Sequence, residues 1–159
     1  MRNTGASSTM MRVIPVCVLV IFTFTVAASE EPLLALTVTV DGAEPYVGQI
    51  LVSLFDSEET YLKNPIAMKA NAVDADGRAV FAFDGLRPGE YAVTVMHDEN
   101  SNGKLDTGFL RIPKEKIGYS NNAKGTLGPA SYDKTRFQLT GSNTEITVTL
   151  GSVKKNKKK

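Results

Sequence analysis

The sequence predicts an all-β protein, a single seven-stranded antiparallel β-sandwich with one long ordered loop. Three observations support this: short runs in which apolar and polar residues alternate, turn-forming Gly, Asp, Asn and Pro between the runs, and a stretch from His97 to Thr135 with little alternation. Alternation with a period of two is typical of strands that bury one face. The chain has 159 residues, enough for one well-packed domain and too few for two.

The N-terminal residues have the features of a secretory signal peptide. Two arginines precede an apolar run from Val13 to Val26, and small residues around Ala28 follow it. A basic start, a short apolar segment and a small-residue exit are typical of such signals. The run is also short for a membrane span, which needs roughly 20 residues. We expect a signal peptide at residues 1–28 and export to a periplasmic or extracellular location, with no transmembrane segment after cleavage; an uncleaved membrane anchor is the alternative.

Composition excludes several classes of function. Cys17 is the one cysteine and lies in the expected leader, so the mature chain can form no disulfide and no Cys-built metal site. A single His excludes a multi-His metal centre, and a net charge of +1 argues against nucleic-acid binding. Residues 29–153 form the expected domain and hold 11 basic and 17 acidic side chains. The lysine-rich residues 154–159 are expected to be a disordered tail, with contact to anionic envelope surfaces as the alternative.

The alternating runs place the seven strands in order. They are expected at residues 34–40, 49–55, 68–73, 78–83, 90–97, 136–139 and 145–150, of which 68–73 has the weakest pattern. Turns at 74–77 and 84–89 contain glycines that can take a positive φ. One short helix is expected at Ser57–Lys63, after a favourable N-cap and before Asn64-Pro65.

The central strands resemble a known group of sandwiches. Their motif is Gly77-Arg78-x-Val80-Phe81-x-Phe83-x-Gly85-Leu86-x-Pro88-Gly89-x-Tyr91. It is similar to the core of prealbumin-like domains, which include carboxypeptidase regulatory-like domains and the B-type repeats of bacterial adhesins. The resemblance implies a Greek-key order, in a prealbumin- or immunoglobulin-like fold. It implies no function, because this fold carries many.

The residues after the fifth strand have the spacing of a calcium loop. Oxygen-bearing groups at relative positions 1, 3, 5, 7 and 9, with Gly at position 6, match the first part of an EF-hand. They are Asp98, Asn100, Asn102, the backbone carbonyl of Lys104, and Asp106. Position 12 is Phe109 rather than Glu, so we expect Glu115 to complete the shell. The resemblance to adhesin repeats, which contain related loops, supports this hypothesis.

Two interpretations of this loop remain open. A Ca²⁺ site with two loop carboxylates is expected to be structural and weak, with a Kd on the order of 10⁻⁴–10⁻³ M. The alternative is a loop of Asx-turns, in which the same oxygens accept backbone N–H groups.

The segment from Ile117 to Tyr132 is the second candidate site, because it is rich in Gly, Asn and Tyr. Aromatic rings beside amides suit the binding of a glycan or a peptide. The candidate ligand-binding residues are Tyr119, Asn121, Asn122 and Tyr132. If this interpretation holds, both rings are accessible on a concave patch; the alternative is that they pack against the sandwich.

Several blocks of this region also resemble, in order, the signature of an exported bacterial family, domain of unknown function 2141. They are His97–Asn100, Asn102–Asp106, Ile112–Glu115, Gly118–Asn122 and Gly128–Tyr132. The resemblance implies a small exported sandwich and brings no activity with it.

His97 is the one imidazole that could support acid–base catalysis, and no nucleophile motif surrounds Ser101, Ser120 or Ser131. We therefore expect no catalytic residue, and we expect His97 to complete the inward face of its strand and to hydrogen-bond into the long loop. The predicted function is a non-enzymatic envelope module, binding or structural, whose partner is an envelope protein or a glycan. An enzyme that uses His97 is the less favoured alternative.

Overall fold

The strands pair into two sheets, and burial alternates along several of them. The computed structural model describes residues 32–126 and 128–151; the expected signal peptide, Cys17 and the lysine-rich tail lie outside the described residues. The strands are β1 (Leu34–Asp41), β2 (Gln49–Phe55), β3 (Ala67–Ala72), β4 (Ala79–Leu86), β5 (Gly89–Asp98), β6 (Ile117–Tyr119), β7 (Phe137–Leu139) and β8 (Asn143–Thr149). Short helices are η1 (Phe109–Arg111), η2 (Ser120–Asn122) and α1 (Tyr132–Thr135).

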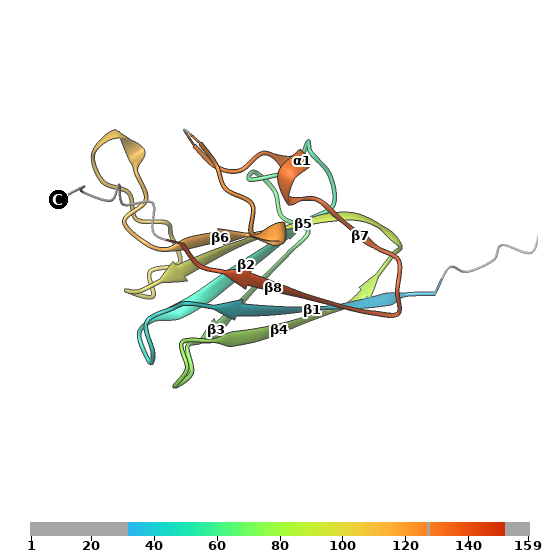
Figure 1. Cartoon of the computed structure of the whole chain (residues 1–159), viewed down its shortest axis with the longest axis horizontal. Coiled ribbons are helices and arrows are strands. Elements are labelled where there is room, and N and C mark those ends of the chain that lie inside the picture. Colours follow the sequence, from blue (N-terminus) through green and yellow to red (C-terminus); the bar gives the residue numbers. More distant parts are fainter. Residues whose placement is uncertain (1–31, 127, 152–159) are drawn as a thin grey trace, which may run out of the picture.

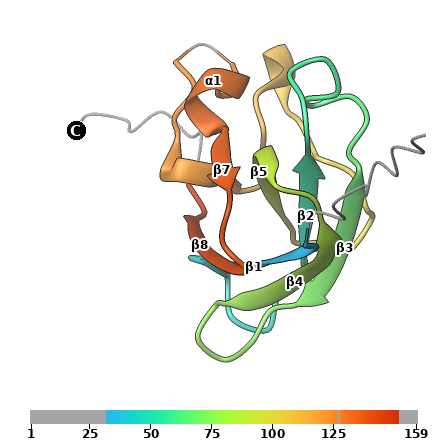
Figure 2. The ribbon, with the colours of Figure 1, turned by 90° about the vertical axis from the view of Figure 1, so that its right-hand side faces the viewer.

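One sheet has the order β4-β1-β8, and the other has the order β3-β2-β5-β6 with β7 also paired to β5 (Figure 1). The strands β6 and β7 occupy successive parts of one edge of β5, because β6 pairs with residues 94–96 and β7 with residues 89–91. Figure 2 shows the two layers, with β8, β1 and β4 in one and β7, β5 and β2 in the other. None of the helices in the described part of the chain is long and apolar enough to cross a membrane.

The core lies between the sheets and is built from the alternating positions. In β1 and β4 the buried residues alternate with less buried ones, as the period of two predicts. The largest fully buried side chains include Leu36, Ile50, Leu54, Phe81 and Leu139. The all-β class is therefore confirmed, and each of the seven expected strands is present, with shifts of at most three residues at their ends.

Four details differ from the expectations. The described residues contain eight strands rather than seven, because β6 lies within the predicted long loop. The pair β1–β8 is parallel, whereas we expected only antiparallel pairs. Period-two alternation is the same in both directions, so it carries no information on strand direction. The Greek-key order stays a prediction.

The other two differences concern the short helices. The expected helix at Ser57–Lys63 is a turn, and α1 and the two 3₁₀ turns were not expected. The Oγ of Ser57 lies 2.9 Å from Oγ1 of Thr60, and Leu62 has a positive φ of 60°. These local bonds and the left-handed residue stop helix propagation, and the segment is held by its buried Tyr61.

The two sheets are joined differently at their two sides. On one side, Ile117 of β6 and Gly151 exchange two backbone hydrogen bonds of 3.2 and 2.8 Å. On the other side, the Lys69 and Asn71 side chains of β3 donate hydrogen bonds to carbonyl groups of β4. The first junction fixes the position of β6 relative to the chain after β8.

Candidate functional site

The loop after β5 is organised around the carboxylate of Asp98, the last residue of that strand. Asp98 is fully buried. Its Oδ2 accepts hydrogen bonds from Gln49 Nε2 and from the Gly103 backbone N–H, both at 2.8 Å, and its Oδ1 accepts one from the Asn102 N–H at 3.1 Å. Burial by itself would raise the pKa of this carboxyl, but these donors outweigh it and hold the pKa below its ordinary value. Asp98 therefore stays ionised in a site shielded from water.

The next polar residues of the loop converge on Asp106. The side-chain nitrogen of Asn100 donates to Asp106 Oδ2 at 2.7 Å, and that of Asn102 donates to Oδ1 at 3.3 Å. The side-chain oxygens of both asparagines accept backbone N–H groups two residues further on, from Asn102 at 3.0 Å and from Lys104 at 2.7 Å. In this conformation the oxygens act as they do in Asx-turns.

Glu115, near the end of the loop, is hydrogen-bonded to residues at the start and in the middle of the loop. It is buried, and its two carboxylate oxygens accept hydrogen bonds from the backbone N–H groups of Glu99 at 3.2 Å and of Asp106 at 2.9 Å. The turn between β1 and β2 packs beneath the same loop. Gly48 has a positive φ of 60°, and a Cβ on it would collide with the Asp98 carbonyl oxygen.

Among the predicted ligands, the structure joins the side chains of Asn100 and Asn102 to that of Asp106. The carboxylates of Asp98 and Glu115 contact the same loop only through its backbone N–H groups. Lys104 joins Asn102 through its backbone N–H. Among the described residues, no group of three or more His, Cys, Asp or Glu side chains is arranged to hold a metal ion. The loop oxygens are satisfied by N–H donors instead. Neither Asp98 nor Glu115 forms a salt bridge within the described part of the chain.

The two tyrosine rings of the second candidate segment, residues 117–132, are buried in the protein. Tyr119 and Tyr132 are only 9% and 7% exposed, so the two rings do not form the accessible platform that the binding hypothesis requires. The Tyr132 ring packs edge-to-face on Tyr61, with centroids 5.6 Å apart. Burial raises the pKa of both tyrosines. The Tyr132 ring therefore belongs to a hydrophobic cluster with Phe55, Tyr61 and Ala92, and Tyr119 is buried outside that cluster.

The two asparagines of this segment also bond to the protein itself. The Asn121 side chain donates to the carbonyls of Lys134 and Arg136, at 3.2 and 2.9 Å. The Asn122 Oδ1 accepts the N–H of Thr149, the last residue of β8, at 2.8 Å. Both amides fasten η2 to neighbouring segments.

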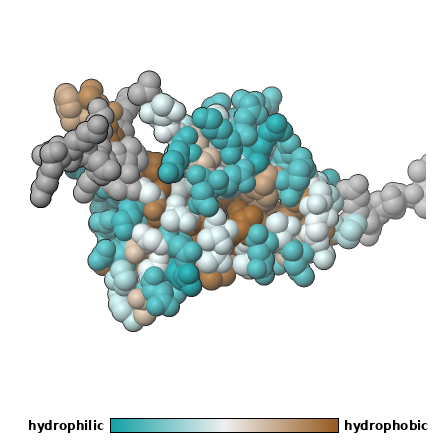
Figure 3. Space-filling model, in the orientation of Figure 1, coloured by the Kyte–Doolittle hydropathy of each residue, from teal (hydrophilic) through white to brown (hydrophobic). Residues whose placement is uncertain are grey.

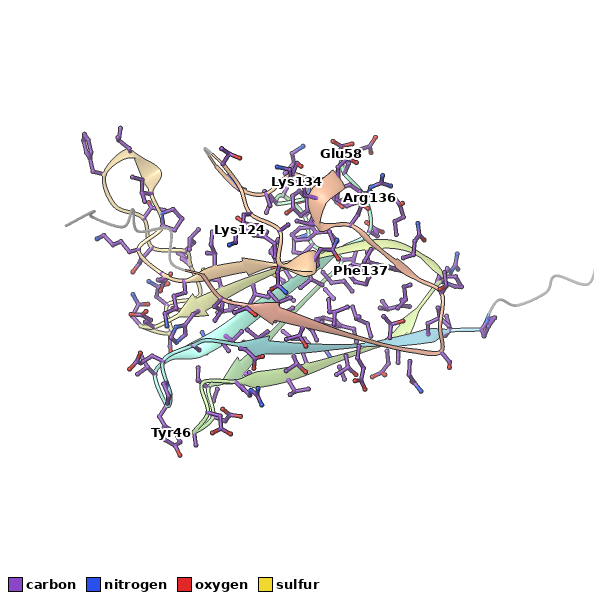
Figure 4. The ribbon with its side chains drawn as sticks, viewed as in Figure 1. Tyr46, Glu58, Lys124, Lys134, Arg136 and Phe137 are labelled. Carbon is purple, nitrogen blue, oxygen red and sulfur yellow. The ribbon has the colours of Figure 1, made fainter. Side chains whose placement is uncertain are left out.

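A pocket of about 670 Å³ nevertheless lies beside this segment. It is lined by Ile117, Gly118, Tyr119, Asn122, Ala123, Lys124, Gly125, Thr126, Gly128, Thr149, Leu150 and Gly151. Lys124 lies above β6 in Figure 4. Two of the four candidate ligand-binding residues, Tyr119 and Asn122, therefore line a cavity whose size is typical of small-molecule sites.

His97 lies inside the sandwich and has no exposed surface. Its Nε2 lies 2.9 Å from the carbonyl oxygen of Val47, which can only accept, so this nitrogen carries the proton. The ring therefore bonds to the β1–β2 connection rather than to the long loop, while its backbone N–H donates to the Lys116 carbonyl at 2.9 Å. Within the described residues Nδ1 has no hydrogen-bond partner, and its nearest acid oxygen is Glu99 Oε1 at 3.8 Å.

Sequence reasoning missed two residues that shape these sites. Gln49 faces Asp98 across the β2–β5 pair, a contact between residues far apart in the chain. Ser120 is fully buried, and its Oγ bonds to the backbone of Val93 and Thr135. Gln49 becomes a neighbour of Asp98 only through the register of β2 and β5, and nothing in the local pattern distinguishes Ser120 from a surface serine.

Comparison with known proteins gives one finding. Residues 38–147 match the family described as "Uncharacterized protein conserved in bacteria (DUF2141)". No curated protein and no solved structure matches the chain.

Proposed function

The chain belongs to the DUF2141 family, and we propose that it is an exported, non-enzymatic module with a binding or structural role in the cell envelope, whose 98–115 loop takes up Ca²⁺. One observation carries the calcium proposal. Asp98 and Glu115 are two buried carboxylates in one loop, and neither has a cationic side chain as a partner among the described residues. Buried charges in proteins are normally paired or bound to a metal ion.

The donor set suits a hard cation. Side-chain oxygens of Asp98, Asn100, Asn102 and Asp106, with the Lys104 carbonyl and Glu115, are the oxygen ligands that Ca²⁺ prefers. In the structure the amide nitrogens of Asn100 and Asn102 lie against the Asp106 carboxylate. A cation there replaces these two N–H donors, and the asparagine side chains turn their oxygens towards it. Because this reorganisation opposes binding, we expect weak affinity, with a Kd on the order of 10⁻⁴–10⁻³ M.

The site proposed is structural. Calcium bound to Asp98 and Asp106 connects the end of β5 to the middle of the loop, and Glu115 extends the connection to the residues before β6. The burial of His97 and its bond to a backbone carbonyl support a non-enzymatic role. Export rests on the leader-like composition of residues 1–28, and N-terminal sequencing of envelope or secreted material tests it; retention of Met1 contradicts it.

Thermal unfolding with and without calcium tests the metal site. We expect millimolar Ca²⁺ to raise the Tm over that in chelator, because a ligand that binds only the native state stabilises it. Asp106→Asn keeps the shape of the side chain and removes one charge, so it should abolish the gain. Asp133→Asn is the matched control, since Asp133 is an exposed acid of α1 outside the loop. An identical Tm in calcium and chelator for the unmodified chain refutes the site.

The pocket beside residues 117–128 favours a second candidate function, the binding of a glycan or a peptide. Lys124 and Thr126 line the pocket and are exposed. Unlike Asn122, whose side chain is bonded to β8, they form no side-chain hydrogen bond within the described residues. Chemical-shift changes on titration with peptidoglycan fragments should appear in residues 117–126 and decrease in Lys124→Ala. Lys134→Ala is the control, because Lys134 is also an exposed lysine but does not line the pocket. Shifts spread over the whole molecule, or none, reject this candidate.

A further inference from the structure

The segment between β5 and β6 contains an exposed apolar turn at residues 109–110. Phe109 and Leu110 are adjacent in η1 and are 88% and 76% exposed, and Phe109 is the most exposed large hydrophobic side chain of the described residues. We call these two residues the tip. Figure 3 shows hydrophobic surface on the projecting loop at the upper left, where Figure 1 places η1. Adjacent Phe and Leu side chains that are this exposed are costly in water unless something covers them.

The loop holds the tip away from the sandwich. Thr107 and Pro113 form an isolated antiparallel bridge, and the Gly108 N–H donates to the Ile112 carbonyl at 2.8 Å. Next to this bridge, the Lys114 N–H donates to the Asp106 carbonyl at 2.9 Å. Leu110 takes a left-handed conformation, with φ of 61°, to complete the reversal. These bonds make a short two-stranded stem, so the tip is presented by ordered backbone.

Charge is separated between this loop and the rest of residues 32–151. Residues 104–116 hold four basic and two acidic side chains, whereas the other residues between 32 and 151 hold seven basic and thirteen acidic ones. Lys114 is exposed at the base of the stem, and Lys104 is exposed two residues before the stem begins at Asp106. Neither forms a salt bridge within the described residues. An anionic surface therefore attracts this loop and repels the other residues of the range 32–151, which orients this domain with the tip towards that surface.

We propose that the tip inserts into the interfacial region of a membrane that carries anionic headgroups, with Lys104 and Lys114 contacting the headgroups. The shape of the loop favours lipid over a protein partner. A stable protein interface buries about 800 Å² on each side, whereas the tip consists of two side chains on a narrow stem. A bilayer accepts isolated apolar side chains beside cations, because the acyl region takes up the apolar groups and the headgroups pair with lysine.

Fluorescence of a single introduced tryptophan tests insertion at this position. The chain contains no Trp, so Phe109→Trp gives a signal from the tip alone. With vesicles of phosphatidylglycerol and phosphatidylethanolamine we expect a blue shift of the emission and quenching by brominated acyl chains. Tyr46→Trp is the matched control. Tyr46 is 77% exposed on the β1–β2 connection, at the lower edge of Figure 4 and away from the tip, so the emission of this variant should not change.

Vesicle binding then measures the contribution of each group. Phe109→Ser with Leu110→Ser should weaken binding to anionic vesicles roughly tenfold or more, because two apolar side chains no longer leave water. Lys104→Gln with Lys114→Gln should weaken it several-fold and reduce its sensitivity to salt. Lys63→Gln with Lys134→Gln removes two exposed lysines elsewhere and should have little effect. Circular dichroism confirms that every variant keeps the strand signal.

Three outcomes distinguish insertion of the tip from calcium binding, from attraction by the lysine-rich tail and from self-association. Membrane binding should occur in chelator as well as in calcium, so loss of the calcium site and loss of the membrane contact give different results. The proposal is overturned if the emission of the Phe109→Trp variant is unchanged by anionic vesicles. It is equally overturned if vesicle binding survives loss of the tip and depends only on the lysines among residues 154–159. A third contrary result is that loss of the tip changes self-association but leaves vesicle binding unchanged.

Discussion

The side-chain amide of Gln49 donates a 2.8 Å hydrogen bond to the carboxylate of Asp98 directly across the β2–β5 pair. This bond joins the first residue of β2 to the last residue of β5, and so links the core sheet to the loop that follows. Since Asp98 has no cationic side chain as a partner among the described residues, neutral donors hold its charge inside the protein.

Stability should therefore fall in acid because of Asp98. Its pKa in the folded state is below the ordinary value of 3.8, so the unfolded chain binds the proton first as the pH decreases. The stabilisation is complete above the unfolded pKa and is lost as the pH falls through the folded one. Urea unfolding at pH 7 and at pH values below about 4 should show this loss, and Asp98→Asn should show a smaller dependence on pH. An equal acid dependence in both proteins would contradict the assignment.

Removal of the Gln49 donor should destabilise the protein at neutral pH. Gln49→Leu leaves a buried carboxylate with fewer donors, and hydrogen bonds to charged groups contribute about 1.5–3 kcal/mol to the free energy of unfolding. Gln138→Leu is the matched control, because Gln138 donates a 2.9 Å bond to Glu90 at an exposed site and should change stability by less than about 0.5 kcal/mol. Chemical denaturation measures both; equal effects would show that burial of Asp98 is unimportant.

Ser120→Ala should cost about 1–3 kcal/mol of unfolding free energy, because it leaves buried backbone groups without a partner. The Oγ accepts the Val93 N–H at 3.0 Å and donates to the Thr135 carbonyl at 2.5 Å. Ser131→Ala serves as the control, since Ser131 is exposed and makes no side-chain capping bond to α1. Hydrogen exchange should also become faster at Val93; unchanged exchange would argue against the bridge.

Gly118→Ala should loosen the junction between β6 and β8. A Cβ on Gly118 would lie 2.7 Å from Cγ1 of Val148 and 3.3 Å from the Thr149 carbonyl oxygen. Overpacking of this kind usually costs about 1–3 kcal/mol. At Gly141 the nearest atom would be 3.9 Å from the new Cβ, so Gly141→Ala should be tolerated. Thermal unfolding compares the two, and a Tm for Gly118→Ala no lower than that for Gly141→Ala would contradict the close approach.

The strands could be predicted from the sequence because burial of one face imposes a period of two on each of them. The strand β6 could not, since its three residues are too few to show a period and it forms by pairing with Thr94–Met96. The bonds of Asn100 and Asn102 to Asp106, and of the Asp98 carboxylate to the N–H groups of Asn102 and Gly103, are local, so the spacing could indicate a loop of Asx-turns. The calcium site stays a prediction. The contribution of Gln49 and the inward rings of Tyr119 and Tyr132 depend on strand register and on packing between distant segments, which local patterns do not contain.

The parallel pairing of β1 with β8 makes the first and last described strands neighbours. The Asp41 carbonyl accepts the Leu150 N–H at 2.8 Å. The next residue, Gly151, exchanges two backbone hydrogen bonds with Ile117 of the other sheet. A nascent chain therefore cannot complete the β4-β1-β8 sheet until residues 143–149 have emerged. Any truncation before that point should leave an open strand edge, which invites pairing with other molecules.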